Sequence, residues 1–269
     1  MVKHHRAGFF SCCALRLYDI IDYFNTHQQL PEIVDSSIQF DWYKVNNNKE
    51  DITFGYFDHY NNHSTFDFVN KINFHWEYQF EDYSNINFDV FSPFMVKYFS
   101  PSLEVQQRIT HLEKKYNICY ENICVLFYRG NDKSTETKLS SYDEYILYTK
   151  EILIREPSTV FFIQSDETEF IDMMSGLFPD NSFFMKDEIR HIPKCKNTVD
   201  HLMRDNIDLF SKLYLAITIM MSKCKYIICG SGNCSIWIML YRGNAKNVYQ
   251  HCVDKWITPK MGIDIDTSL

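Results

Sequence analysis

The sequence lacks several signatures that would place a protein in a common class at once. Its nine cysteines include no C-x-x-C pair, so neither a zinc ribbon nor a thioredoxin-like redox motif is predicted. Neither G-x-G-x-x-G nor the P-loop pattern G-x-x-x-x-G-K-[ST] occurs, which disfavours a dinucleotide-dependent oxidoreductase and a P-loop enzyme. Lys and Arg number 27 against 35 Asp and Glu, a net charge of −8, so no basic face for nucleic acid is expected.

No hydrophobic run reaches the length that a membrane-spanning helix needs, and the longest, residues 213–221, is about half of one. The apolar run at residues 9–15 is short, and Arg16 and Asp19 interrupt it too soon for a signal peptide. An odd number of cysteines without a pairing pattern is typical of a reducing compartment. We therefore expect a cytoplasmic protein with no targeting segment and no membrane anchor.

What the sequence does contain is typical of a globular protein. Its 269 residues can bury a substantial core, as one large domain or two ordinary ones. Apolar residues make up 45% and charged residues 23%, so neither disorder nor a fibrous class is indicated. The aromatic residues, 22 Phe and 18 Tyr among them, either fill the core or stack on sugar rings or bases, and their number alone does not choose.

The second half of the chain alternates between strand and helix patterns. Strands are expected at 124–128, 159–164, 182–185, 225–229 and 247–250. A helix beginning at Pro101 and a helix opened by the capping box of Ser141 and Glu144 are among the helices expected around them. Alternation at this spacing predicts an α/β fold with a doubly wound parallel sheet, so residues 101–255 should form a Rossmann-like unit.

The first hundred residues have a different texture. Asparagine-rich turns separate aromatic segments such as 52–57 and 74–78, which predict short strands or irregular structure. Residues 8–24 begin as an apolar loop and then take on helical spacing. A loop directly before a helix can present backbone N–H groups to a ligand. A buried strand and turn is the favoured interpretation of its start.

Polar residues follow three of the expected strands, at 129–136, 165–167 and 231–235. In a parallel sheet these three loops open on the same edge, where ligands bind. Arg129 and Lys133 could hold a diphosphate, the first as a planar fork and the second as a point charge. The Gly/Ser turn at 231–235 offers backbone amides and a positive helix end to a phosphate. Each loop taken alone is equally compatible with a solvated turn.

Three of these segments resemble the fucosyltransferase superfamily, which includes α1,6-type animal enzymes, rhizobial Nod-factor fucosyltransferases and protein O-fucosyltransferases. Residues 127–136, F-Y-R-G-N-D-K-S-T-E, resemble its Arg-containing motif. Residues 162–166, F-I-Q-S-D, look like its strand ending in a Thr/Ser-Asp pair, and 229–235, C-G-S-G-N-C-S, are similar to its Ser-rich donor turn. The resemblance covers about residues 100–250. The chain is also similar to short glycosyltransferases of large DNA viruses, which lack a membrane anchor.

The resemblance implies a GT-B-like enzyme with two Rossmann-like domains that transfers sugar with inversion and needs no metal. It assigns residues 1–100 to an acceptor-side domain, 101–255 to a nucleotide-sugar-binding domain and 256–269 to a C-terminal tail. The implied partners are a nucleotide-sugar donor and an oligosaccharide or glycoprotein glycan whose hydroxyl is glycosylated. The donor is a co-substrate, so no further cofactor is expected.

The family's functional residues carry over to matching positions. Arg129 matches the essential Arg, Lys133 the nearby Lys, and Glu136 an acid near the acceptor, which makes it the candidate general base. A fixed guanidinium and helix-end amides would stabilise the charge that develops on the leaving diphosphate without a metal. The implied donor-binding residues are Arg129, Ser165, Asp166, Ser231, Gly232, Asn233, Cys234 and Ser235.

Two departures from the family bear on the donor. Phe127 stands where members often have His, and residues 215–218 contain no acid where members carry an Asp that pairs with guanine. Guanine N–H donors without a partner would disfavour binding. GDP-fucose and a UDP-sugar such as UDP-xylose therefore both remain open, and with them hexosyl and pentosyl transfer.

Two other classes of protein fit the sequence less well. A GT-A enzyme needs an Asp-x-Asp metal clamp after a strand, but the best match, residues 264–266, follows Pro259 and Gly262 and is read as a solvated tail. A lectin-like or scaffold module would bind glycans through aromatic residues without turnover. Such a module has no need for Arg129 and Lys133 at the end of a strand.

Overall fold

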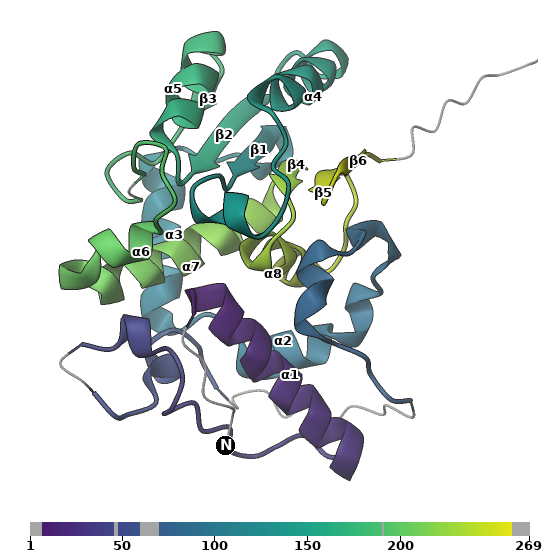
Figure 1. Ribbon diagram of the computed structural model, residues 1–269, viewed down its shortest axis with the longest axis vertical. Helices are drawn as coiled ribbons and strands as arrows, with labels where there is room; N and C mark the ends of the chain where they lie inside the picture. The colour runs from purple at the N-terminus through teal and green to yellow at the C-terminus, as the bar shows by residue number, and fades with distance from the viewer. Residues whose placement is uncertain (1–6, 46–47, 60–69, 190, 260–269) are drawn as a thin grey trace, which may run out of the picture.

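A single six-stranded sheet forms the centre of the C-terminal half (Figure 1). The computed structural model describes residues 7–45, 48–59, 70–189 and 191–259. The strands are β1 Ile123–Tyr128, β2 Val160–Ser165, β3 Ser182–Phe183, β4 Tyr226–Gly230, β5 Val248–Cys252 and β6 Lys255–Ile257. Their order is β3-β2-β1-β4-β5-β6, with β1 to β5 parallel and β6 antiparallel to β5. The predicted α/β fold with a parallel sheet is confirmed.

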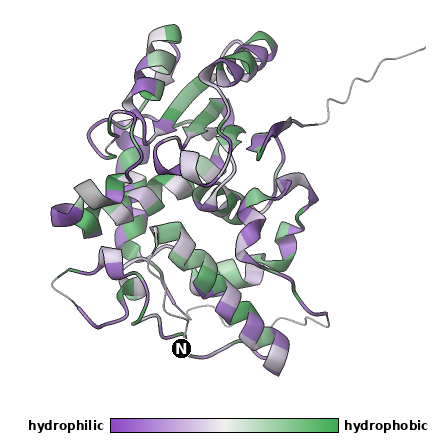
Figure 2. Ribbon diagram, viewed as in Figure 1, coloured by the Kyte–Doolittle hydropathy of each residue, from purple (hydrophilic) through white to green (hydrophobic). Residues whose placement is uncertain are grey.

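Helices cover both faces of this sheet (Figure 1). The α-helices are α1 Phe9–His27, α2 Ser92–Tyr98, α3 Leu103–Lys115, α4 Tyr142–Arg155, α5 Thr168–Leu177, α6 Val199–Leu202, α7 Ile207–Lys223 and α8 Asn233–Arg242. On β1, Val125 and Phe127 join the core that contains α3, α7 and α8, while Leu126 joins the opposite core with α4 and α5. All of β1 is buried, and Figure 2 shows the central strands mainly in the colour of hydrophobic residues. Strands buried on both faces are typical of doubly wound sheets.

The strand register brings three strand ends to one edge. Tyr128 at the end of β1 lies opposite Ser165 at the end of β2, and Phe127 lies opposite Cys229 near the end of β4. The first residues beyond these strands are Arg129, Asp166 and Ser231. Because the strands are parallel, all three connections leave the sheet on the same side. The predicted convergence of the polar loops is confirmed.

The first hundred residues differ from the expectation of a second Rossmann-like domain. Where the structure describes residues before Pro101, it shows α1, α2 and five short 3₁₀ helices but no β-strand. The 3₁₀ helices are Asp41–Tyr43, Ile52–Gly55, Trp76–Phe80, Tyr83–Asn85 and Phe88–Val90. Of the two predicted alternatives, short strands or irregular structure, the aromatic segments therefore adopt irregular structure. Tyr56, Phe57 and Phe74 of these segments join the same core as α7 and α8.

The start of α1 differs from the expected strand and turn. The favoured buried strand and turn is wrong, because the helix begins at Phe9 directly after Gly8. Phe9, Phe10, Cys13 and Leu17 are all buried at helical spacing, so packing of one face stabilises the helix from its first residue. This helix has no side-chain N-cap, the usual sequence signal for a helix start.

Smaller corrections concern element ends. Pro101 is not the first residue of a helix; it makes an isolated β-bridge with Phe57, and Ser102 caps α3 instead. The expected strand at 247–250 continues to Cys252, and β6, which was not predicted, includes the first residues assigned to the tail. Residues 264–266 lie outside the described part of the chain. The division of the chain at 100 and 255 stays a prediction.

Candidate functional site

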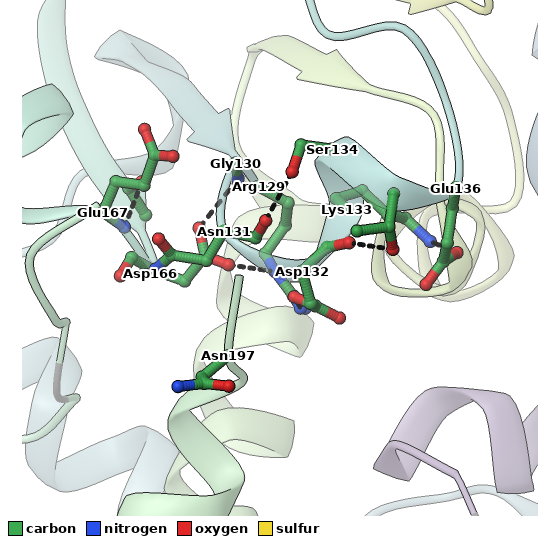
Figure 3. Close-up of polar contacts among 12 residues, drawn as sticks. Arg129, Gly130, Asn131, Asp132, Lys133, Ser134, Glu136, Asp166, Glu167 and Asn197 are labelled. Atoms are coloured by element: carbon green, nitrogen blue, oxygen red, sulfur yellow. Dashed lines mark hydrogen bonds and ion pairs between the residues drawn. The ribbon is translucent and has the colours of Figure 1, made fainter. Parts of the chain in front are cut away.

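Arg129, the first residue after β1, is held by three side chains, and Figure 3 labels two of them, Asp166 and Asp132. Its Nε donates to Asp166 Oδ2 at 2.9 Å, its Nη2 to Asp132 Oδ1 at 2.8 Å and its Nη1 to the Tyr214 hydroxyl at 3.2 Å. Burial lowers the pKa of this guanidinium, but Tyr214 and the two carboxylates raise it by more, so Arg129 stays charged. The guanidinium plane is fixed and has a permanent charge.

Asp166, the first residue after β2, ties two loops together. Its Oδ1 accepts from the backbone N–H of Gly130 at 2.9 Å, and its backbone oxygen accepts from the side chain of Asn131 at 2.8 Å. Since Oδ2 accepts from Arg129, both carboxylate oxygens bind within the protein. Asp166 therefore fixes the orientation of the Arg129 side chain and of the backbone that follows it. Its predicted contact with the donor stays a prediction, as does that of Ser165.

Gly130 is required by the side chain beside it. A Cβ at this position would lie 2.1 Å from Oε1 of Glu167. Glu167 is completely buried, and its Oε2 accepts a hydrogen bond from the Tyr142 hydroxyl. Burial raises the pKa of Glu167. The close approach of a buried carboxyl group leaves no room for a larger residue in this turn.

Lys133 and Glu136, which were predicted separately, form an ion pair with each other at 2.5 Å. The ammonium group of Lys133 also donates to Gln79 Oε1 at 3.4 Å and lies 5.5 Å from the centre of the Phe80 ring. Lys133 is almost fully buried, whereas the Glu136 side chain is 45% exposed. The cation is thus fixed in the wall of the site and its partner lies at the rim.

The turn after β4 leads directly into α8. The Ser231 hydroxyl donates to the backbone oxygen of His251 at 3.0 Å, and the Ser235 hydroxyl donates to that of Gly230, so both hydroxyls brace the turn. Among the described residues, no side chain caps the first N–H groups of α8, which leaves them available to an anion. Burial raises the pKa of Cys234 to about 11, so its thiol is neutral and is no nucleophile at neutral pH.

These loops surround one cavity of about 360 Å³. The predicted residues that line it are Arg129, Lys133, Glu136, Ser231, Gly232, Asn233, Cys234 and Ser235. A smaller adjoining cavity is lined by Ser165 and Asp166 and shares Arg129 and Tyr214 with the larger one. The structure therefore brings together the residues that sequence reasoning selected from three separate loops.

Sequence reasoning missed the contributions of other segments. Tyr214 of α7, Asp200 of α6 and Gln79 line the same cavity, as do the first residues of α1 and Trp42 and Trp76. Tyr214 shares helical spacing with the apolar residues Ile207 and Phe210, so the sequence does not distinguish it from a core residue. The N-terminal end of α1 was considered as a ligand contact, and the structure places Gly8 to Ser11 at the cavity.

Comparison with known proteins gives matches among solved structures only. No protein family and no curated protein matches the chain. A NodZ alpha-1,6-fucosyltransferase soaked with GDP-fucose is 13% identical, with a TM-score of 0.34 over 60% of this chain and 50% of that one. The same enzyme co-crystallized with GDP is 16% identical (TM-score 0.31, 52% and 41%), and fucosyltransferase NodZ from Bradyrhizobium is 14% identical (TM-score 0.34, 60% and 49%). The matches span about half of those chains or less.

Two further findings concern the residues that the structure describes. None of their helices combines the length and the apolar character that a membrane span requires. Within the same residues, no group of three or more His, Cys, Asp or Glu side chains is placed to hold a metal ion. All nine cysteines are free thiols.

Proposed function

We propose that the protein is an inverting, metal-independent glycosyltransferase that moves a sugar from a nucleotide-sugar donor to a hydroxyl of a glycan. The observation that carries this proposal is the grouping of Arg129, Lys133 and the uncapped N-terminal end of α8 around one cavity. Two cations and a row of backbone N–H groups are what a diphosphate binds. The sequence resemblance to fucosyltransferases supports the same reaction.

Arg129 would stabilise the leaving group. When the bond between sugar and diphosphate breaks, negative charge builds up on the terminal phosphate oxygen. Asp166 and Tyr214 already hold the guanidinium in place, so it need not reorganise as that charge develops. A charged donor fixed in a partly buried site can contribute several kcal/mol of transition-state stabilisation, about 3 kcal/mol for one such donor.

Glu136 would be the general base. Its pairing with Lys133 would make its availability as a base depend on donor binding. In the structure the half-exposed carboxylate of Glu136 pairs with the buried ammonium group of Lys133. A diphosphate that contacts Lys133 takes over that role, which frees Glu136 to accept the proton of an acceptor hydroxyl. Donor binding would then precede acceptor activation, and the base would be released only when there is a sugar to transfer.

The donor is proposed as a class, with two members to be tested. Residues 215–218 supply no carboxylate for guanine. A UDP-sugar such as UDP-xylose is therefore considered beside GDP-fucose, and the acceptor is an oligosaccharide or a glycan on a glycoprotein. A panel of UDP, GDP, UDP-xylose and GDP-fucose, with thermal unfolding as the measurement, separates the possibilities. A ligand at about 100 times its Kd adds about 2.7 kcal/mol to the free energy of unfolding.

Replacement of Arg129 by Ala tests the site. We expect R129A to fold, to lose the rise in Tm that the nucleotide gives the wild type, and to transfer sugar at least about 100-fold more slowly. Arg108→Ala is the matched control, because Arg108 lies on α3 and pairs with Glu104 away from the cavity. R129A protein that binds nucleotide and turns over like the wild type would refute the proposed role.

A glycan-binding protein without turnover is the second candidate. Trp42 and Trp76 line the cavity and could hold a sugar ring without any donor. This candidate predicts binding to a printed glycan array in the absence of nucleotide, together with no change in Tm on addition of any member of the nucleotide panel.

A further inference from the structure

Trp76 is a large apolar side chain left open at the candidate site. It begins the 3₁₀ helix Trp76–Phe80, is 61% exposed and lines the same cavity as Arg129 and Glu136. Trp42, from the 3₁₀ helix Asp41–Tyr43, lines that cavity as well. The helix that carries Trp76 packs against α1 and α8, while the one that carries Trp42 packs against α7. Two indoles from unrelated segments therefore meet at one cavity.

The segment around Trp76 is fastened to the donor loops. Gln79 accepts from Lys133, and the hydroxyl of Tyr83 donates to the backbone oxygen of Gln79 at 3.0 Å and accepts from Gly232 N–H at 3.4 Å. The backbone N–H of Tyr83 donates to Gln250 at 2.9 Å. These contacts fix the base of the exposed indole relative to both the β1 and the β4 loops. Its exposure is thus not that of a loose surface loop.

Polar residues line the same cavity beside the two indoles. Asn233 and Thr198 are among them, together with the charged groups of Arg129 and Glu136. A ligand that suits this cavity therefore has a flat apolar face for an indole and hydroxyl groups at its edge. A pyranose ring has both features.

We propose that Trp76, supported by Trp42, forms the acceptor subsite, where it stacks on a pyranose ring of the glycan. Hydroxyls at the edge of that ring would meet polar residues of the cavity lining, and one hydroxyl would enter the part of the cavity that Glu136 lines. The inference rests on the proposed function, since it assigns the second substrate of the same site. It names the class of acceptor as a glycan with an accessible pyranose face.

The test compares Trp76→Ala, Trp76→Phe and the control Phe54→Ala in the full-length chain. Phe54 is also an exposed aromatic residue, at 58%, but it does not line the cavity. Each variant is applied to a printed oligosaccharide array with UDP or GDP present, and the Kd of each nucleotide is measured by calorimetry. The KM for a glycan found on the array, kcat, and hydrolysis of donor in the absence of acceptor are then determined.

For W76A we expect a loss of glycan binding and a rise in acceptor KM of about tenfold, as for loss of one stacked ring. The nucleotide Kd and donor hydrolysis should stay within about twofold of the wild type, and W76F should restore most of the glycan binding. F54A should behave as the wild type.

Three results would overturn the subsite. Glycan binding by W76A equal to that of the wild type would do so, as would a wild type that binds no glycan on the array. Loss of nucleotide affinity in W76A as large as the loss of glycan binding would show that the indole stacks on the nucleotide base instead. Failure of the proposed function looks different: no nucleotide binds the wild type, while glycan binding that depends on Trp76 persists.

Discussion

Arg129 and Lys133 are each paired with carboxylates, but the partners differ in exposure. The side chain of Asp166 behind Arg129 is 8% exposed, whereas that of Glu136 on Lys133 is 45% exposed. An ion pair with an exposed partner is weak and exchanges readily for another anion. Arg129 is therefore the permanent element of the candidate site, and Lys133 is the element that responds to a ligand.

Gly232 determines where Lys133 lies. Its φ is 156°, and a Cβ there would be 2.7 Å from Cε of Lys133. We expect Gly232→Ala to push the ammonium group from its place and to weaken nucleotide binding by about tenfold, the loss of one charge-assisted hydrogen bond. The backbone strain should also lower the free energy of unfolding by about 1 kcal/mol. Calorimetric titration and urea unfolding measure the two effects.

Gly176→Ala is the matched control for that prediction. Gly176 lies within α5, and a Cβ there would meet nothing within 4 Å. Alanine has the higher helix propensity, so this variant should gain about 0.5–1 kcal/mol of stability and bind nucleotide as the wild type does. Unchanged nucleotide binding in Gly232→Ala would contradict the role given to Lys133.

Among the secondary-structure elements, α4 has the clearest start signal. The Ser141 hydroxyl accepts from the Glu144 N–H, and the Glu144 carboxylate accepts from the Ser141 N–H at 2.7 Å. We expect Ser141→Ala to lower the free energy of unfolding by about 1 kcal/mol in urea titrations. Glu144→Gln keeps an acceptor at the same place and should cost less. Equal stabilities of S141A and wild type would show that tertiary packing alone starts this helix.

Elements with local sequence signals could be predicted, whereas elements that depend on tertiary contacts could not. The strands of the parallel sheet are apolar runs buried on both faces, and α4 has a local cap, so the sequence carries their signals directly. β6 has only three residues, none of them buried, and it exists because β5 offers it a partner. α1 has no cap and forms because its apolar face meets the core. Elements that depend on distant partners leave little local pattern.

The residues of the candidate site likewise fall into a group that the sequence predicted and a group that it did not. Arg129, Asp166 and Ser231 were found because each directly follows a strand, and strand ends of a parallel sheet converge. Tyr214 and Trp76 were missed because one lies in the apolar stripe of α7 and the other in an irregular segment. Neither sequence position indicates a residue of the cavity lining, because the cavity forms only when distant segments of the chain pack together.

At the scale of the whole molecule, a buried polar network connects α1 to other segments of the N-terminal part of the chain. Arg16 of α1 donates to the backbone oxygen of Val34, to the Ser36 hydroxyl and, from Nη2 at 3.0 Å, to His59 Nδ1. Nε2 of His59 lies 3.1 Å from the hydroxyl of Thr53. Arg16 is completely buried, so this network links α1 to loops that are distant in the sequence.

This network predicts how stability depends on pH. Burial, and then the charge of Arg16, lower the pKa of His59 from 6.5 to about 4, while Asp51 and Asp58 oppose the shift. The neutral ring fits the network, because Nδ1 accepts from a guanidinium and could not do so once protonated. Between pH 6.5 and about 4 the unfolded chain therefore binds a proton that the folded chain does not.

The free energy of unfolding should accordingly fall as the pH drops through this window, by about 3 kcal/mol in total from His59. The contribution is fully present above pH 6.5, where the ring is neutral in both states. Urea titrations at pH 7.5, 5.5 and 4.5 measure this change in the free energy of unfolding. His59→Asn should flatten the pH dependence. The control His111→Asn, at an exposed position on α3, should keep it. A wild type whose stability is the same at pH 4.5 and 7.5, or an H59N protein with an undiminished slope, would mean that His59 does not couple the N-terminal segment to pH.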